Sequence, residues 1–159
     1  MSEHEPSTIA EVADNARMHV RSLGVLVTLV TDETQIVLVN SGWPMASDDA
    51  YATPIDYSIC RHAAANRSTL VITDAHADPL VQNSLAVLEV GIGSYLGVPF
   101  YIGNSVASAI CAICTEKRDW SSSDVAHMER AAARAAVALM PDVAVLPDTL
   151  PLIAPRLHA

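Results

Sequence analysis

Residues 78–100, DPLVQNSLAVLEVGIGSYLGVPF, determine the fold expected for this chain, because they join a helix to a strand. Asp78 is a good helix N-cap, and Pro79 suits the first helical position. Gly91 can take the left-handed conformation in which helices commonly end. The sequence therefore predicts a helix over residues 79–90, followed by the extended segment GIGSYLGVPF.

Hydrophobic periodicity and turn residues predict the other elements on both sides of this stretch. We expect helices at residues 8–23 and 59–66 and from Ser121 to Met140, strands at 25–30, 36–39, 69–73, 94–102 and 106–115, and a loop at 41–56. Gly103 and Asn104 suit a tight turn between the last two strands. These two strands are apolar on both faces, so layers should cover both sides of the sheet.

The first and last helices both carry start signals and an apolar stripe. Thr8 with Glu11, and Ser121 with Asp124, have the spacing of capping boxes. The narrow stripe of the last helix is rich in alanine, which allows close approach to another helix. The natural mate is the first helix, in the same subunit or in a partner.

Composition limits the possible functions. The chain has 159 residues, 51% of them hydrophobic and 17% charged, which suits one domain at residues 1–140. A net charge of -9 argues against nucleic acid as a partner. No secretory signal and no apolar run of membrane-spanning length is present, and three cysteines suit reduced thiols, so we expect a cytoplasmic protein that does not bind membranes. Residues 141–159 contain four prolines and predict an extended tail.

Several segments together resemble the GAF family of bacterial sensory domains. They are SICRH at residues 58–62, VITDA at 71–75, the stretch quoted first, and AICAICTEKRDWSSSD at 109–124. The resemblance covers roughly residues 20–140. It implies an α/β fold with a central, mainly antiparallel sheet, terminal helices on one face and short helices and loops on the other. It also implies a homodimer formed through the terminal helices.

The same resemblance implies a pocket on the sheet face opposite the terminal helices. The candidate ligand-binding residues at matching positions are Trp43, Tyr57, Cys60, His62, Asp74, His76, Tyr95 and Gly97. Tyr95 and Gly97 share a strand face, where the glycine leaves room and the tyrosine offers a hydroxyl beside an apolar ring. These residues could equally fill a core.

Catalytic and metal sites are weakly indicated. Cys111 and Cys114 form a C-x-x-C on an expected strand, where residues three apart point to opposite faces, so they should not share a metal. The six histidines show no ligand spacing, and Asp74 and Asp78 suit a turn and a helix cap. We expect no catalytic residue and no metal, and the sequence does not identify a cofactor.

The sequence thus favours a stand-alone sensory domain, not an enzyme. It would bind a small molecule of unknown identity and signal through dimer geometry or a partner protein. One alternative is a thiol-dependent enzyme of the free methionine sulfoxide reductase type, with Cys60 or Cys111 as nucleophile. Another is an interaction module without a ligand.

Overall fold

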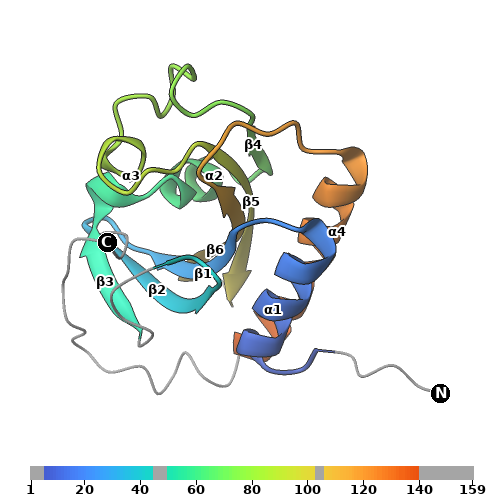
Figure 1. Cartoon of the computed structure of the whole chain (residues 1–159). Helices are drawn as coiled ribbons and strands as arrows, with labels where there is room; N and C mark the ends of the chain where they lie inside the picture. The colour runs from blue at the N-terminus through green and yellow to red at the C-terminus, as the bar shows by residue number, and fades with distance from the viewer. Residues whose placement is uncertain (1–5, 45–49, 103–105, 140–159) are drawn as a thin grey trace.

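The fold is a six-stranded antiparallel sheet with helices on both faces, as predicted (Figure 1). The computed structural model describes residues 6–44, 50–102 and 106–139. The strands, in the order β3-β2-β1-β6-β5-β4, are β1 (Gly24–Val30), β2 (Thr34–Ser41), β3 (Tyr51–Pro54), β4 (Leu70–Ile72), β5 (Ser94–Ile102) and β6 (Val106–Cys114). The helices are α1 (Ile9–Val20), α2 (Cys60–Asn66), α3 (Leu85–Leu88) and α4 (Ser122–Leu139), with a 3-10 turn η1 (Ile55–Tyr57).

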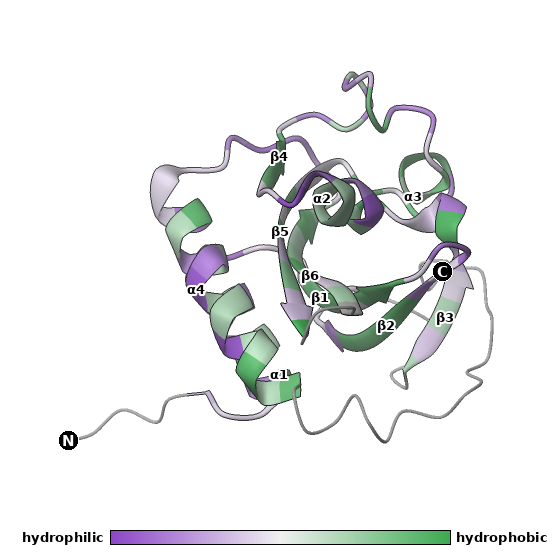
Figure 2. Cartoon of the chain, turned by 180° about the vertical axis from the view of Figure 1, so that it is seen from behind, coloured by the Kyte–Doolittle hydropathy of each residue, from purple (hydrophilic) through white to green (hydrophobic). Residues whose placement is uncertain are grey.

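The sheet separates two hydrophobic cores. Successive residues of β1 alternate between them: Val25 and Val27 face the helices α1 and α4, and Leu26 faces the other side. In β6, Ile110 and Ala112 likewise belong to the helix-side core. Figure 2 shows the apolar character of these central strands. Burial on both faces explains why their sequence is an almost continuous apolar run.

The helices α1 and α4 lie side by side and antiparallel on one face of the sheet (Figure 1). Their contact is lined by small buried side chains, among them Ala13, Ala16, Ala132 and Ala135. The first helix is therefore the mate of the last one within the same subunit, which was one of the two expected arrangements. None of the described helices is long and apolar enough to cross a membrane.

Both predicted capping boxes are confirmed. Thr8 Oγ1 accepts from the Glu11 backbone N–H, and a Glu11 carboxylate oxygen accepts from the Thr8 backbone N–H. The side chains of Ser121 and Asp124 accept from each other's backbone N–H in the same way. The C-terminal boundary of α1 was predicted three residues too late, because Arg21 takes the left-handed cap with a φ of 61°.

The helix predicted at residues 79–90 is wrong in its length. Asp78 caps only a single turn, in which its carbonyl accepts from Val81 and Gln82. Ser84 is extended, at φ -67° and ψ 144°, and its hydroxyl accepts from Ala86, so it ends that turn and begins the short helix α3. Gly91 has a φ of 91°, and the left-handed conformation predicted there is confirmed.

The loop predicted at residues 41–56 contains a strand. β3 pairs with the first half of β2, and its apolar side chains are buried. The prediction was wrong because Pro54 and Asp56 are turn residues, and this strand is short and ends at its proline on the sheet edge. The Gly103–Asn104 turn and the tail at residues 141–159 lie outside the described residues.

Arg118 connects the two terminal helices to the far edge of the sheet. Its guanidinium donates to the carbonyls of Val20 and Arg21 at the end of α1 and pairs with Asp124, at 3.3 Å, at the start of α4. It also lies 4.2 Å from the ring centre of Trp120, whose indole N–H donates to Ile72 in β4. A cation at a helix C-terminus interacts favourably with the helix dipole.

We predict that Arg118→Met lowers the free energy of unfolding by about 2 kcal/mol, because the two carbonyls and Asp124 lose a charged donor. Urea denaturation of the two proteins measures the difference. Arg130→Met, at an exposed position of α4, is the matched control and should change stability little. Equal effects of the two substitutions would show that Arg118 does not hold the helices.

A second prediction concerns His19 and His127, whose rings stack 4.7 Å apart between α1 and α4. Desolvation lowers the pKa of His127, and the nearby His19, Arg130 and Arg134 lower it further, while Asp124 opposes them. The unfolded chain therefore binds a proton at this residue more readily than the folded one. Stability from this source is present above the ordinary histidine pKa of 6.5 and is lost as the pH falls below it.

His127→Gln should flatten the loss of thermal stability between pH 7.5 and 5.5, approximate limits that lie on both sides of the ordinary pKa. Melting temperatures measured across that window test this. His76→Gln, at an exposed histidine in a loop, serves as the control. An unchanged slope in His127→Gln would contradict the assignment.

Candidate functional site

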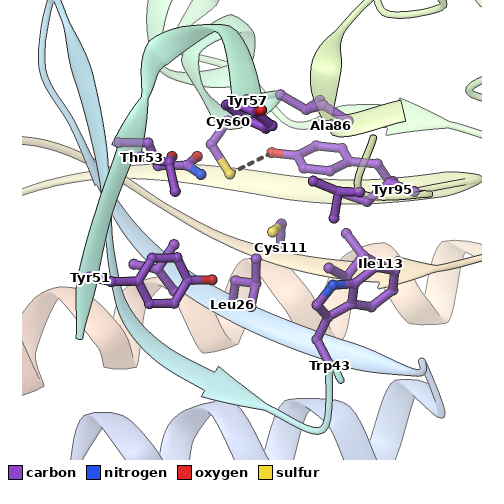
Figure 3. A pocket seen from close by; sticks show the side chains of 15 residues that line it. Leu26, Trp43, Tyr51, Thr53, Tyr57, Cys60, Ala86, Tyr95, Cys111 and Ile113 are labelled. Carbon is purple, nitrogen blue, oxygen red and sulfur yellow. Dashed lines mark hydrogen bonds between the residues drawn. The ribbon is translucent and has the colours of Figure 1, made fainter. Parts of the chain in front are cut away.

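A small, mainly apolar pocket lies on the sheet face opposite α1 and α4 (Figure 3). Its walls come from β1, β2, β3, β5, β6, the start of α2, α3 and the residues that follow α3. The free volume is about 30 Å³. A cavity needs about 10–15 Å³ of such space to hold one water molecule, so this pocket admits only one or two water-sized molecules.

One end of the pocket is polar. Gln35 and Thr53 are paired across β2 and β3, and both line the cavity. The Gln35 carbonyl oxygen accepts from the Ser58 hydroxyl at 2.6 Å. Thr53 is fully buried, and its Oγ1 has no hydrogen-bond partner among the described residues. An unpaired buried hydroxyl is costly, which makes Thr53 a natural contact for a polar group of a ligand.

Two cysteines and a tyrosine form the centre of the pocket (Figure 3). The Tyr95 hydroxyl donates to Cys60 Sγ at 3.1 Å. The Cys60 thiol also interacts with the neighbouring thiol of Cys111. The hydrogen bond from Cys111 lowers the pKa of Cys60 despite the opposing effect of burial, whereas the same bond and burial raise the pKa of Cys111. Cys60 is therefore the thiol of the pair that ionises first.

The two buried tyrosines of the pocket stay protonated. Burial, together with a smaller effect of the neighbouring Cys111, raises the pKa of Tyr51 to about 12. Burial also raises the pKa of Tyr95 well above its usual value, with smaller contributions from Cys60 and Cys111. Both phenols are thus hydrogen-bond donors at neutral pH. At the edge of the pocket, the Tyr57 hydroxyl donates to Glu89.

The ring of Tyr95 fills the space above Gly97. A Cβ added at Gly97 would lie 2.0 Å from the Tyr95 hydroxyl oxygen and 2.4 Å from the ring carbon that bears it. The glycine leaves room, as the sequence suggested, but the room is taken by a side chain of the same strand. This close approach positions the Tyr95 hydroxyl at Cys60.

The chain matches the model of a known family. A family model described as "GAF domain" matches residues 7–139 of the chain. The chain belongs to the GAF domain family. Among curated proteins, none matches this GAF domain.

Solved GAF domains share its fold at low sequence identity. The GAF domain of an Acinetobacter phosphoenolpyruvate-protein phosphotransferase has a TM-score of 0.69 and 10% identity, over 89% of this chain and 85% of that chain. The second GAF domain of DevS from Mycobacterium smegmatis has a TM-score of 0.63 and 22% identity, over 89% and 97%. A free methionine-R-sulfoxide reductase from Neisseria meningitidis, in complex with its substrate, has a TM-score of 0.63 and 16% identity, over 87% and 83%.

The structure places four of the eight predicted site residues in the lining of the GAF pocket. They are Trp43, Tyr57, Cys60 and Tyr95. Gly97 lies next to the lining, beneath Tyr95. His62 instead lines a separate depression on the outer side of α2, and its pKa is lowered by burial and by the charge of Arg61.

The remaining two candidates, Asp74 and His76, lie in the turn after β4 and do not line the pocket. The Asp74 carbonyl accepts from Ala77 in that turn. The family resemblance pointed to this loop, but neither Asp74 nor His76 lines the cavity. No three His, Cys, Asp or Glu side chains gather as a metal site within the described ranges.

Sequence reasoning missed Gln35, Tyr51 and Thr53, and did not include Cys111 among the candidate ligand-binding residues. β3 was not predicted, so its alternating residues could not be assigned to a face. For Cys111 the signal was present: the strand alternation that separates it from Cys114 also directs it to the pocket side, and the structure confirms that separation. What the sequence could not supply was its pairing with Cys60, which lies 51 positions earlier.

We predict that Gly97→Ala destabilises this GAF domain by more than about 2 kcal/mol, because the new methyl group must displace the buried Tyr95 ring. A double-mutant cycle with Tyr95→Ala tests the cause, since removing the ring frees the space. In the Tyr95→Ala background, Gly97→Ala should cost less than half as much, as measured by urea denaturation. Additive costs would show that the methyl group is rejected by some other contact.

Proposed function

We propose that this GAF domain is a sensory domain, not an enzyme, which binds a small molecule with an apolar body and one polar group in the pocket. The observation that carries the proposal is Thr53, a fully buried hydroxyl without a partner that lines an otherwise mainly apolar cavity. Small-molecule sites typically combine such apolar walls with a few placed polar groups. The GAF neighbours support the fold of a receptor and do not identify the ligand.

The pocket must open to admit a metabolite. Its free volume of about 30 Å³ is far below the roughly 300 Å³ and more of typical ligand pockets. The cover consists of two short elements, β3 and α3, with four residues each, and the start of α2. Short elements with few buried contacts open most readily. A ligand that binds only the open arrangement shifts the population towards it.

Two connections support transmission from the pocket to the terminal helices. The first is the sheet itself, since Leu26 lines the pocket while its neighbours Val25 and Val27 contact the α1 and α4 core. The second is the hydrogen bond from the Thr69 hydroxyl, after α2, to Glu129 in α4 at 3.0 Å. Movement of α2 is thereby passed to α4.

In this proposal, the signal passes to the second subunit of a homodimer or to another protein, either of which contacts α1 and α4. Met18 and Val137 expose 70% and 71% of their surface there, which is unusual for large apolar residues.

The acidic net charge and free cysteines agree with a cytoplasmic location. The thiol-dependent reductase is less well supported, because among the described residues the pocket lining contains no charged side chain to hold the amino and carboxylate groups of a free amino acid.

Native mass spectrometry of protein purified without denaturant tests the receptor proposal. We expect a retained small mass that is lost on denaturation. We also expect phenol, an apolar ring with one hydroxyl, to change the fluorescence of Trp43 in the pocket lining. Thr53→Val keeps the shape and removes the hydroxyl, so it should weaken binding of the retained molecule or of phenol about tenfold.

Thr73→Val is the matched control, because Thr73 is exposed after β4 and does not line the cavity, and it should leave binding unchanged. The proposal would be contradicted if no mass were retained and phenol did not bind. Equal weakening by both valine variants would also contradict a contact at Thr53.

A further inference from the structure

The pair of pocket thiols is not explained by binding of a small apolar ligand. Cys60 and Cys111 are 2% and 1% exposed, and free buried cysteines commonly act as small apolar fillers. A filler does not need hydrogen bonds. Cys60, however, accepts a hydrogen bond from the Tyr95 hydroxyl and lies beside the Cys111 thiol in the pocket lining.

A phenol hydroxyl that donates to the sulfur favours the thiolate form of Cys60. Hydrogen bonds to the charged form of an acid stabilise that form and lower its pKa. Tyr95 remains protonated and so keeps its donor, for the reasons given above. The thiolate is the reactive form of cysteine in oxidation and exchange. The neighbouring Cys111 stays a neutral thiol beside it.

The free volume next to the two sulfurs limits the size of an oxidant that can reach them. Both cysteines line the cavity of about 30 Å³, which has room for one or two water-sized molecules. Hydrogen peroxide is about as large as two water molecules, whereas organic peroxides and disulfides such as glutathione disulfide are much larger. The cavity therefore combines a nucleophilic sulfur, a second thiol and space for a small oxidant.

We propose that Cys60 and Cys111 form a peroxide-reactive pair that closes to an intramolecular disulfide inside the GAF pocket. The Cys60 thiolate attacks one oxygen of hydrogen peroxide, the O–O bond breaks, and hydroxide leaves, so that Cys60 becomes a sulfenic acid. The hydroxide takes up the proton that Cys60 released on ionising, and forms water. Cys111 then attacks the Cys60 sulfur, the S–O bond breaks, and the oxygen leaves as a second water with the Cys111 proton. Both sulfurs are oxidised, and the peroxide is reduced.

The disulfide links the start of α2 to the centre of β6. A sulfur–sulfur bond of roughly 2.0 Å is shorter than a hydrogen-bonded thiol contact, so its formation draws α2 towards the sheet. It also removes the thiolate that accepts from Tyr95. The reaction modifies the protein once per oxidant and does not depend on the receptor proposal, so the failure of either leaves the other standing.

Peptide mapping after treatment with hydrogen peroxide tests the pair. The chain has only three cysteines, and cleavage by trypsin would leave Cys60 on peptide 22–61 and both Cys111 and Cys114 on peptide 68–117. We therefore use Cys114→Ser, in which a link between these peptides within one chain identifies Cys60 and Cys111. The expected result is a loss of two hydrogens in the intact mass and one linked peptide pair, both reversed by a reducing agent.

Cys114 in the unaltered chain provides an internal reference. It is the more exposed thiol, and it lies on the opposite face of β6 from the pocket. Exposure alone predicts that Cys114 oxidises first, whereas the proposal predicts that Cys60 reacts at least about tenfold faster. Faster oxidation of Cys114, or persistence of the Cys60 and Cys111 thiols in a folded chain whose Cys114 is oxidised, would overturn the proposal.

Three substitutions separate the roles of the residues. Cys111→Ser should trap a sulfenic acid on Cys60 that a cyclic diketone probe labels, and Cys60→Ser should leave Cys111 unlabelled. Tyr95→Phe removes one donor to the thiolate and should slow oxidation about tenfold below the thiol pKa, with the rate profile shifted to higher pH. Labelling of Cys111 in Cys60→Ser, or an unshifted pH profile in Tyr95→Phe, would contradict the assignment of Cys60 as the nucleophile.

Discussion

The antiparallel pairing of β1 with β6 is the interaction on which the rest of the structure depends. It joins the two halves of the chain at the centre of the sheet, with Val27 opposite Ile110 and Leu26 opposite Cys111. Because side chains alternate along each strand, the first pair belongs to the helix-side core and the second pair lines the pocket. A one-residue shift in register would exchange the two sets and place Cys111 beneath α1 and α4. The pocket and the helix pair are therefore specified by the same hydrogen bonds.

Arg118 connects the pair of helices α1 and α4 to the sheet at a second place, near the edge strand β4. The sheet holds the helix pair from below, whereas Arg118 holds one end of it, where α1 ends and α4 begins. Its backbone N–H also donates to Thr73 just after β4, and Trp120 beneath its guanidinium reaches β4 as well. Burial of hydrophobic surface alone would let two alanine-lined helices slide against each other. Directional bonds to helix-end carbonyls fix their position along the axis.

The sequence predicted correctly the features that depend on residues close together in the chain. The capping boxes at Thr8 and Ser121 were found because both partners lie within three positions, and the central strands because their apolar runs are long. The errors arose where contact with a distant segment determines the secondary structure. β3 is a strand only because β2 offers it an edge, and Ser84 interrupts the helix predicted after Asp78 by capping a new one. In the pocket, Tyr95 could be assigned to the right face, but its partner Cys60 could not be identified, since contacts between distant segments leave no local signal.

The helix α2 is where a ligand and an oxidant would act on the same mechanical element. Its C-terminal end is fixed to β5, because the Ala64 carbonyl accepts from the Tyr101 hydroxyl at 2.7 Å and Arg67 lies 4.3 Å from the centre of the same ring. Its N-terminal end carries the sulfur contacts of Cys60, and the Ser58–Gln35 hydrogen bond lies just before it at the polar end of the cavity. Entry of a ligand at Thr53 would move that end outward, and a disulfide to Cys111 would pull it inward, so the two inputs would oppose each other at α4 through Thr69 and Glu129.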